Sequence, residues 1–281
     1  MRVATFALAL ITATQTHSAL AGVPYRGEPV RMVSRYPVVV TFLNGQGPFH
    51  MMIDTGAVRC AVRPSVAVRA GLLPTGAVLL ATMVGEKIVS TARASVRVGL
   101  REAPGTEVLI NDLPTLNGLE SHIDGMIGQN FLSMAPYLVD YRARRLWLGI
   151  EAIQKAQRFG LPRRVEFLSG RPIVPLAIDS KARPMRLILD SGVNDLVLRC
   201  GHRCGTLVDE HATWAMTNAG QIGARKGQVP VAILGPEKFY RMQAVLIRKE
   251  ADPNNAEGAM PLSWFSAVYV HPAQGVIRWA R

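Results

Sequence analysis

The stretch Met52-Ile53-Asp54-Thr55-Gly56 returns in closely similar form as Ile188-Leu189-Asp190-Ser191-Gly192. In both places an apolar run typical of a strand leads straight into an aspartate, a small hydroxyl residue and a glycine. The two aspartates are 136 residues apart (190 − 54). The repeat predicts two half-chains, each of which places a carboxylate where a strand gives way to a turn.

The residues around each aspartate repeat as well. Residues 36–53 and 171–189 each hold two apolar runs separated by a turn-forming stretch, which predicts a β-hairpin whose second strand delivers the aspartate. Beyond each aspartate the order also agrees: an acidic residue, a glycine and an apolar run (122–132 and 255–265), then a closing pair of strands (137–148 and 267–279).

Between these landmarks each half carries a segment that predicts a second hairpin. In the first half, strands at 78–83 and 87–98 surround Val84-Gly85-Glu86; in the second half, runs at 213–216 and 228–233 surround a stretch of turn formers at 218–221. Each alone is compatible with an ordinary surface hairpin. Because both lie between the aspartate and the acidic block, we expect them to cover the aspartates as flaps.

Helical patterns are short. Residues 64–70 predict one or two helical turns that end at Gly71, and residues 151–159 predict a helix between the halves. The predicted fold is therefore mainly β. We expect one lobe at 22–150, a connector at 151–170 and a second lobe at 171–281.

The first residues differ from the rest of the chain. Arg2 precedes an apolar run at 3–13, a polar patch and the small residues Ala19-Leu20-Ala21. This layout predicts a signal peptide at 1–21, removed near Ala21, and hence a periplasmic or secreted protein; a buried N-terminal helix is the alternative. The apolar run is too short to span a bilayer, so we expect no stable membrane insertion.

The composition is that of a globular protein, with 49% hydrophobic and 19% charged residues. Lys and Arg outnumber Asp and Glu by 32 to 20. The excess is scattered along the chain and has no aromatic residues interleaved with it, which argues against nucleic-acid binding. Surface solvation together with attraction to an anionic envelope is the simpler interpretation of the charge.

Three cysteines are present. Cys200 and Cys204 are close enough in sequence for a local disulfide, which an oxidising compartment would favour, with Cys60 left free and buried. A metal site made of Cys200, His202, Cys204 and His211 is the alternative on ligand type, but the spacing matches no common zinc pattern.

Two equivalent aspartates have a specific chemical use. If a pseudo-two-fold axis brings Asp54 and Asp190 face to face, both cannot be ionised at once and one proton is shared. The ionised member takes a proton from a water held between them, while the protonated member donates to the carbonyl oxygen under attack. Gly56 and Gly192 would let each loop turn tightly beside the carboxylates.

The motifs around the first aspartate resemble those of a known protein family. Asp54-Thr55-Gly56-Ala57 and Asp124-Gly125-Met126-Ile127-Gly128 resemble the motifs of retropepsin-like aspartic proteases, and the doubled plan resembles a pepsin-like fusion of two such lobes in one chain. The resemblance covers residues from about Tyr36 to Trp279 and is weaker in the second half.

The resemblance implies a two-lobed acid-protease-like β-barrel fold and an aspartic endopeptidase that acts on peptide or protein substrates. It implies catalysis by Asp54 and Asp190, with Thr55 and Ser191 bracing the loops and no metal or organic cofactor. Gly85 and Gly220 would lie near the flap tips. We expect a monomer, because a tethered lobe has an effective concentration on the order of millimolar.

Some residues depart from the family pattern. Pro261 stands where Gly128 stands in the first half and lacks an N–H. Cys60 replaces a hydroxyl residue, Asp195 adds a carboxylate, and neither flap tip has a tyrosine.

Other functions are compatible with parts of the sequence. A peptide- or protein-binding module on the same scaffold is the main alternative to an enzyme, favoured by Pro261. A glycosidase would also use paired carboxylates but lacks aromatic sugar platforms. The side chains of Ala57 and Val193 offer no hydrogen bond to the aspartates, which predicts activity at a less acidic pH than pepsin's.

Overall fold

The structure of the protein is a computed structural model that describes residues 26–82, 85–119, 122–178, 183–199, 207–248 and 255–281. Strands dominate it, and the prediction of a mainly β fold is confirmed. The predicted signal peptide at 1–21 and the predicted Cys200–Cys204 disulfide lie outside the described residues.

The chain forms two bodies with similar order. The first lobe contains β1 (Glu28–Val33), β2 (Tyr36–Leu43), β3 (Gln46–Ile53), β4 (Cys60–Val62), α1 (Pro64–Arg69), β5 (Gly76–Ala81), β6 (Glu86–Val98), β7 (Arg101–Ile110), η1 (Pro114–Leu116), β8 (Gly125–Ile127) and α2 (Gln129–Leu132). The second lobe contains β12 (Glu166–Leu168), β13 (Arg171–Leu176), β14 (Met185–Asp190), β15 (Leu196–Arg199), β16 (Val208–Thr217), β17 (Gly220–Leu234), β18 (Glu237–Ile247), β19 (Gly258–Pro261) and η2 (Leu262–Trp264).

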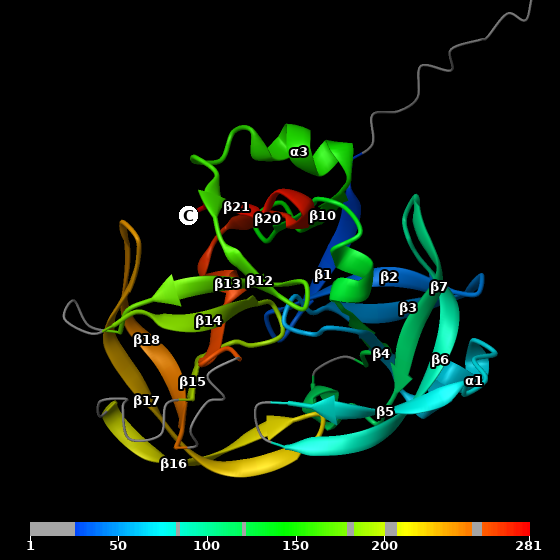
Figure 1. The fold of residues 1–281 in the computed structure, drawn as a ribbon, viewed down its shortest axis with the longest axis horizontal. Helices are drawn as coiled ribbons and strands as arrows, with labels where there is room; N and C mark the ends of the chain where they lie inside the picture. Colours follow the sequence, from blue (N-terminus) through cyan, green and yellow to red (C-terminus); the bar gives the residue numbers. More distant parts are fainter. Residues whose placement is uncertain (1–25, 83–84, 120–121, 179–182, 200–206, 249–254) are drawn as a thin grey trace, which may run out of the picture.

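A third group of strands, here called the bridging sheet, joins the lobes at the top of Figure 1. It consists of β9 (Tyr137–Asp140), β10 (Arg145–Leu148), β11 (Arg163–Arg164), β20 (Ala267–His271) and β21 (Val276–Ala280). β20, from the end of the chain, pairs antiparallel with β9 from its middle. The halves are therefore linked by sheet hydrogen bonds as well as by the connecting chain.

The two lobes share one register. In the first lobe β3 lies parallel to β8, with Met52 opposite Met126; in the second β14 lies parallel to β19, with Ile188 opposite Ala259. Since parallel partners cannot be joined by a tight turn, the intervening chain leaves the pair and returns, and in both lobes it forms a long hairpin on the way. The predicted repeat of hairpin, aspartate and acidic block thus has the same sheet geometry twice.

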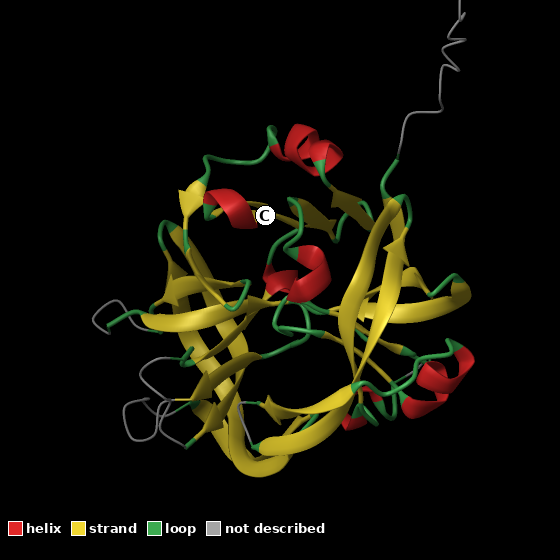
Figure 2. Ribbon diagram, turned by 45° about the vertical axis from the view of Figure 1, so that its right-hand side comes forward, coloured by secondary structure: helices red, strands yellow, loops and turns green. Residues whose placement is uncertain are grey.

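The two helices that the sequence predicts are both present. α1 begins at Pro64, which suits a first helical turn, and the chain after it passes through Gly71 at φ +63°, a conformation that favours glycine. α3 (Ile150–Ala156) lies over the bridging sheet, where Ala152 and Ala156 pack with Trp147. Figure 2 shows the helices as short pieces among the strands.

The stretch 151–170, predicted to be a connector, also contains sheet. β12 pairs with β13, and β1 pairs with β2 in the same way, so each lobe has one more N-terminal strand than the sequence pattern indicates. β12 is hard to detect in the sequence because it has only three residues. No helix of the described residues is long and apolar enough to cross a membrane.

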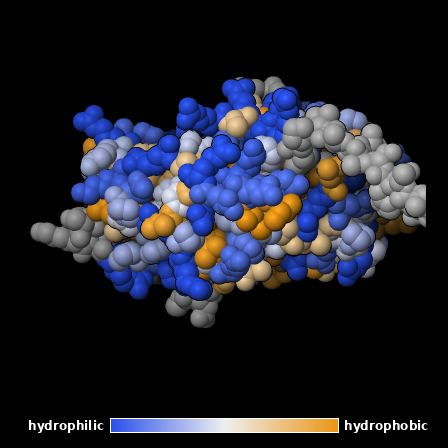
Figure 3. Space-filling view, turned by 90° about the horizontal axis from the view of Figure 1, so that it is seen from above, coloured by the Kyte–Doolittle hydropathy of each residue, from blue (hydrophilic) through white to orange (hydrophobic). Residues whose placement is uncertain are grey.

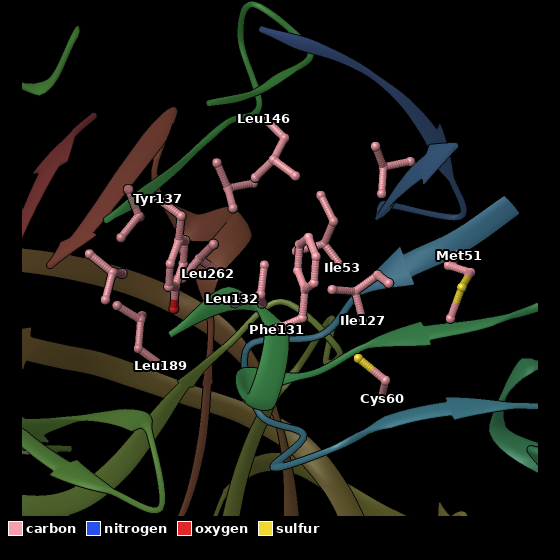
Figure 4. Packing of buried hydrophobic residues seen from close by; sticks show 14 of the residues in the cluster. Met51, Ile53, Cys60, Ile127, Phe131, Leu132, Tyr137, Leu146, Leu189 and Leu262 are labelled. Atoms are coloured by element: carbon pink, nitrogen blue, oxygen red, sulfur yellow. The ribbon is translucent and has the colours of Figure 1, made fainter. Parts of the chain in front are cut away.

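A large apolar core runs through both lobes and the bridging sheet. Figure 4 shows how its members interlock near the middle of the molecule: Ile53 and Ile127 lie beside Phe131, and Leu189 and Leu262 lie nearby with Tyr137. Outside this core, hydrophilic residues cover most of the face seen from the bridging sheet (Figure 3).

Candidate active site

The two aspartates lie at equivalent ends of strands. Asp54 follows β3, and its N–H donates to the carbonyl of Ile127 on β8 at 3.0 Å. Asp190 is the last residue of β14, opposite Pro261 of β19. Each carboxylate therefore stands on a strand fixed by a parallel neighbour.

The residues after the aspartates cross between the lobes and bind each other reciprocally. The Thr55 hydroxyl donates to the Leu189 carbonyl at 2.8 Å and accepts the Ser191 N–H at 2.9 Å. The Ser191 hydroxyl donates to the Ile53 carbonyl at 2.7 Å and accepts the Thr55 N–H at 3.0 Å. Both side chains are buried, so these four bonds, here called the brace, hold the two loops in one geometry.

The brace brings the carboxyl groups of Asp54 and Asp190 into hydrogen-bonding contact with each other. Backbone N–H groups of Gly56 and Ala57 donate to Asp54 Oδ1 at 3.0 and 2.9 Å, and the N–H of Gly192 donates to Asp190 Oδ1 at 2.6 Å. The Ala57 backbone thus supplies a bond that its side chain cannot.

Glycine is required on both loops because each lies against the opposite carboxyl. A Cβ at Gly192 would lie 2.8 Å from Asp54 Oδ1, and one at Gly56 would overlap the Asp190 carboxyl. Real Cβ atoms essentially never approach so closely, so both glycines are needed for the two carboxyl groups to meet.

The surroundings of the two carboxyl groups change their pKa values. Burial raises the pKa of Asp54 well above its usual range, and the neighbouring Asp190 raises it further. Burial also raises the pKa of Asp190, but hydrogen bonds from Gly192 and Asp54, and the charge of Arg171, oppose the rise. Because both pKa values are raised and the carboxyl groups are in contact, the pair shares one proton over a range of pH in which an isolated carboxyl would be ionised.

Pro261 does not separate the pair. In the first lobe the N–H of Gly128 points to Cys60 Sγ at 3.5 Å, and a side chain at Gly128 would collide with the Arg59 backbone. In the second lobe Pro261 ends β19 with φ −59°, which suits proline. The substitution changes the support behind Asp190 and leaves its carboxyl in contact with Asp54.

The two long hairpins, β5–β6 and β16–β17, meet on the side opposite the bridging sheet (Figure 1). Gly85 lies in the turn of the first hairpin, and Gly220 follows the turn of the second. The hydroxyls of Thr82 and Thr217 lie 2.8 Å apart, so the tips touch.

The tip of the second hairpin is also tied to the first lobe. The carbonyl of Asn218 accepts from Asn111 Nδ2 at 3.0 Å, and its side-chain oxygen accepts from the Thr115 hydroxyl at 2.7 Å. Asn111 directly follows β7, and Thr115 lies in η1. The second hairpin thus crosses the boundary between the lobes, which the sequence pattern does not reveal.

Two further side chains near the pair were missed by the sequence pattern. Tyr36 and Arg171 begin β2 and β13 and each precede a proline, 18 residues before Asp54 (54 − 36) and 19 before Asp190 (190 − 171). The charges of both aspartates act on both side chains. The similar spacing before the repeated aspartates, together with the proline that follows each residue, was the available signal.

The remaining predicted residues make no hydrogen bond to the carboxyl pair among the described residues. Asp195 forms an ion pair with Lys226 at 2.8 Å, and Cys60 is buried with its pKa raised to about 12 by burial. Among the described residues no cluster of His, Cys, Asp and Glu could hold a metal ion; of the predicted metal ligands only His211 is described. A surface hollow of about 400 Å³ lies along β16–β18 near Trp214, and no residue of the carboxyl pair lines it.

Comparison with known proteins agrees with the geometry of the first lobe. Residues 38–131 match the family model described as Aspartyl protease. That range contains β3, the Asp54 loop, the first hairpin, β8 and most of α2. A second β-sheet body follows it. The search of curated proteins gave no match.

Proposed function

Since residues 38–131 form an aspartyl protease domain, we propose that the chain is an aspartic endopeptidase in which Asp54 and Asp190 activate water together. The observation that carries the proposal is the brace between Thr55 and Ser191, because it holds two buried carboxyls from different lobes in hydrogen-bonding contact. A structural role alone would not explain two buried, mutually repelling carboxyls, since unpaired buried charge is costly.

One shared proton gives the two carboxyls different roles, and we assign the ionised role to Asp190 because the charge of Arg171 opposes the rise of its pKa. Asp190, ionised, takes a proton from the water as its oxygen attacks the peptide carbonyl carbon, and Asp54 gives its proton to the carbonyl oxygen. The product of this step is a neutral tetrahedral diol. Asp190 then gives its proton to the amide nitrogen while Asp54 recovers one from a diol hydroxyl, so the C–N bond breaks and both carboxyls return to their first state.

The hairpins take part by opening and closing. In the closed arrangement Thr82 meets Thr217, and Asn218 is bonded to the first lobe. An extended peptide enters after these contacts break, and closure then limits the access of bulk water to the carboxyls. Flexible or unfolded segments are the substrates that fit, because they present an extended backbone.

The test is digestion of a denatured protein between pH 3 and 8. The Asp54→Asn and Asp190→Asn variants should each lose activity by at least about 10³-fold, within the range that general acid and base catalysis contributes. Asp195→Asn, a matched change in the ion pair with Lys226, should retain it. Cleavage that persists in both dyad variants would show that other residues are responsible.

A non-catalytic peptide-binding module is the second candidate, and Pro261 favours it because the support behind Asp190 differs from that behind Asp54. In that case the unsubstituted protein would bind unfolded chains without cutting them. Mass spectrometry of the digest separates the two functions directly.

Export is part of the proposal. The layout of residues 1–21 supports removal of a signal peptide near Ala21 and a periplasmic or secreted location. N-terminal sequencing of the mature chain from fractionated cells tests it. An intact Met1 in the cytoplasmic fraction would contradict export without affecting the proposed chemistry.

A further inference from the structure

The two lobes present different side chains on the face that carries the carboxyl pair. Residues two apart on a strand point to the same face. On β2 and β3 this face includes Val38 and Met52, which pack with Val78 and Leu80 of the first hairpin. It is therefore the face turned toward the hairpin, and Asp54 lies on it, two residues after Met52.

The equivalent face of the second lobe is found in the same way. Ile173 of β13 and Ile188 of β14 are opposite each other and pack together in a small cluster with Leu168. Asp190 lies two residues after Ile188, and Arg171 lies two residues before Ile173. Arg171 is also the register partner of Leu168, which places it on that face by a second route.

Tyr36 and Arg171 are thus related by the pseudo-two-fold axis of the repeat. Val38 opposes Met52 and Ile173 opposes Ile188, so Tyr36 and Arg171 each come two residues before the matched position. One lobe offers a phenol packed in an apolar cluster, and the other a guanidinium. The site is therefore chemically unequal on its two sides.

Arg171 has unused hydrogen-bonding capacity. Within the described part of the chain its one hydrogen bond is from Nε to the Leu168 carbonyl at 3.1 Å, and it forms no ion pair. The guanidinium is partly buried, and its charge lowers the pKa of Asp190. Arginine presents five donors, so the terminal nitrogens remain to meet a carboxylate from outside.

The second lobe also has shorter side chains on this face. Ala256 and Ala259 stand at the positions that Ile123 and Met126 occupy in the first lobe. All four side chains are buried in their respective clusters. The buried apolar side chains of this face are therefore smaller in the second lobe than in the first.

We propose that Arg171 is a specificity-determining residue that selects substrates with a glutamate or aspartate next to the scissile bond on the side of the second lobe. Tyr36 and the apolar cluster around it receive an apolar or aromatic side chain on the other side. This inference rests on the proposed function. A bidentate pair between guanidinium and carboxylate in a partly buried site provides both the affinity and the orientation.

The experiment digests a mixture of peptides from denatured proteins and reads the cleavage sites by mass spectrometry. The unsubstituted enzyme should enrich Glu and Asp at one position beside the cut. Arg171→Gln should lose this enrichment, Arg171→Lys should retain it, and Arg171→Glu should replace it with Lys and Arg. Arg164→Gln, the same change at an exposed site on β11, should leave it intact.

A matched pair of peptides, differing only in Glu or Gln at the enriched position, then gives kcat/KM. The Glu peptide should be favoured by at least roughly 10-fold, the lower end of what hydrogen bonds to a charged group contribute, and Arg171→Gln should bring the ratio close to 1. A general loss of folding would lower both rates and leave the ratio unchanged.

Cleavage without acidic enrichment, or enrichment that survives Arg171→Gln, overturns the inference and leaves the proposed function standing. Absence of any cleavage by the unsubstituted enzyme overturns the proposed function and this inference with it.

Discussion

The two lobes have diverged unequally from one plan. At their contact, Thr55 and Ser191 still make the same four bonds, and both following glycines lie against the opposite carboxyl. A few residues away Tyr36 is matched by Arg171 and Gly128 by Pro261. The difference teaches that the positions which fit against the other lobe keep the same chemistry in both halves, whereas neighbouring positions that make no such contact differ.

The largest expected effect comes from breaking the fit at the contact. Gly56→Ala and Gly192→Ala should each reduce kcat/KM by at least about 10²-fold, because a shift of the order of an ångström in a catalytic group has that effect. Gly56→Ala should be the more damaging, since its Cβ overlaps the Asp190 carboxyl whereas that of Gly192 approaches Asp54 at 2.8 Å.

Gly160→Ala is the matched control, because a Cβ there meets nothing closer than 4.0 Å. Initial rates on a peptide substrate, with thermal unfolding to verify folding, provide the measurement. Equal and small effects of all three substitutions would show that the close approach is not needed for activity.

The two halves of the brace should contribute about equally to the free energy of unfolding. Thr55→Val and Ser191→Ala each remove a buried donor and leave a buried N–H without its acceptor, which should lower the free energy of unfolding by about 2–3 kcal/mol. Urea denaturation measures the free energy of unfolding of each variant.

Thr41→Val is the control, because the Thr41 hydroxyl is buried and has no partner among the described residues. Removing it should be neutral or stabilising. If Thr55→Val were as harmless as Thr41→Val, the brace would contribute little to holding the lobes together.

Because of the carboxyl pair, the stability of the folded state should fall as pH rises. Both folded-state pKa values are raised, so between the ordinary carboxyl pKa near about 4 and the raised values the folded state binds more protons than the unfolded state. Stability therefore falls as pH rises through that window, and the loss is complete above it.

Asp54→Asn removes one member of the raised pair and should increase the melting temperature at pH 7 by about 2–4 °C, the shift that roughly 1 kcal/mol produces in a chain of this size. The advantage should disappear at pH 3, where the carboxyls of both proteins are protonated. A melting temperature that responds equally at both pH values would show that Asn acts by another route.

The smallest effect concerns the asymmetric contact of the second hairpin. Asn218→Ala removes the acceptor of the Thr115 hydroxyl while leaving the backbone bond from Asn111, which should cost less than about 1 kcal/mol. Amide hydrogen exchange at the β16–β17 turn should become faster with little change in the melting temperature.

Gln221→Ala, exposed on the same hairpin, provides the comparison and should not change the exchange. Equal exchange in the two variants would mean that the tip is held by its backbone contacts alone.

The sequence by itself determined the duplicated plan. A strand that ends in an aspartate, a hydroxyl residue and a glycine is a local pattern, and its repetition predicted the mainly β fold and the two hairpins. The pairing of Thr55 with Ser191 was also accessible, through the family resemblance.

Only the tertiary structure decided how the halves meet. The pairing of β9 with β20, the crossing of Asn218 to the first lobe and the approach of Arg171 to Asp190 join residues that no local periodicity relates. Such contacts depend on how two cores pack against each other, and the chain carries no short-range signal of them. For the same reason the sequence showed Pro261 as a departure, while the fold showed that the carboxyl pair tolerates it.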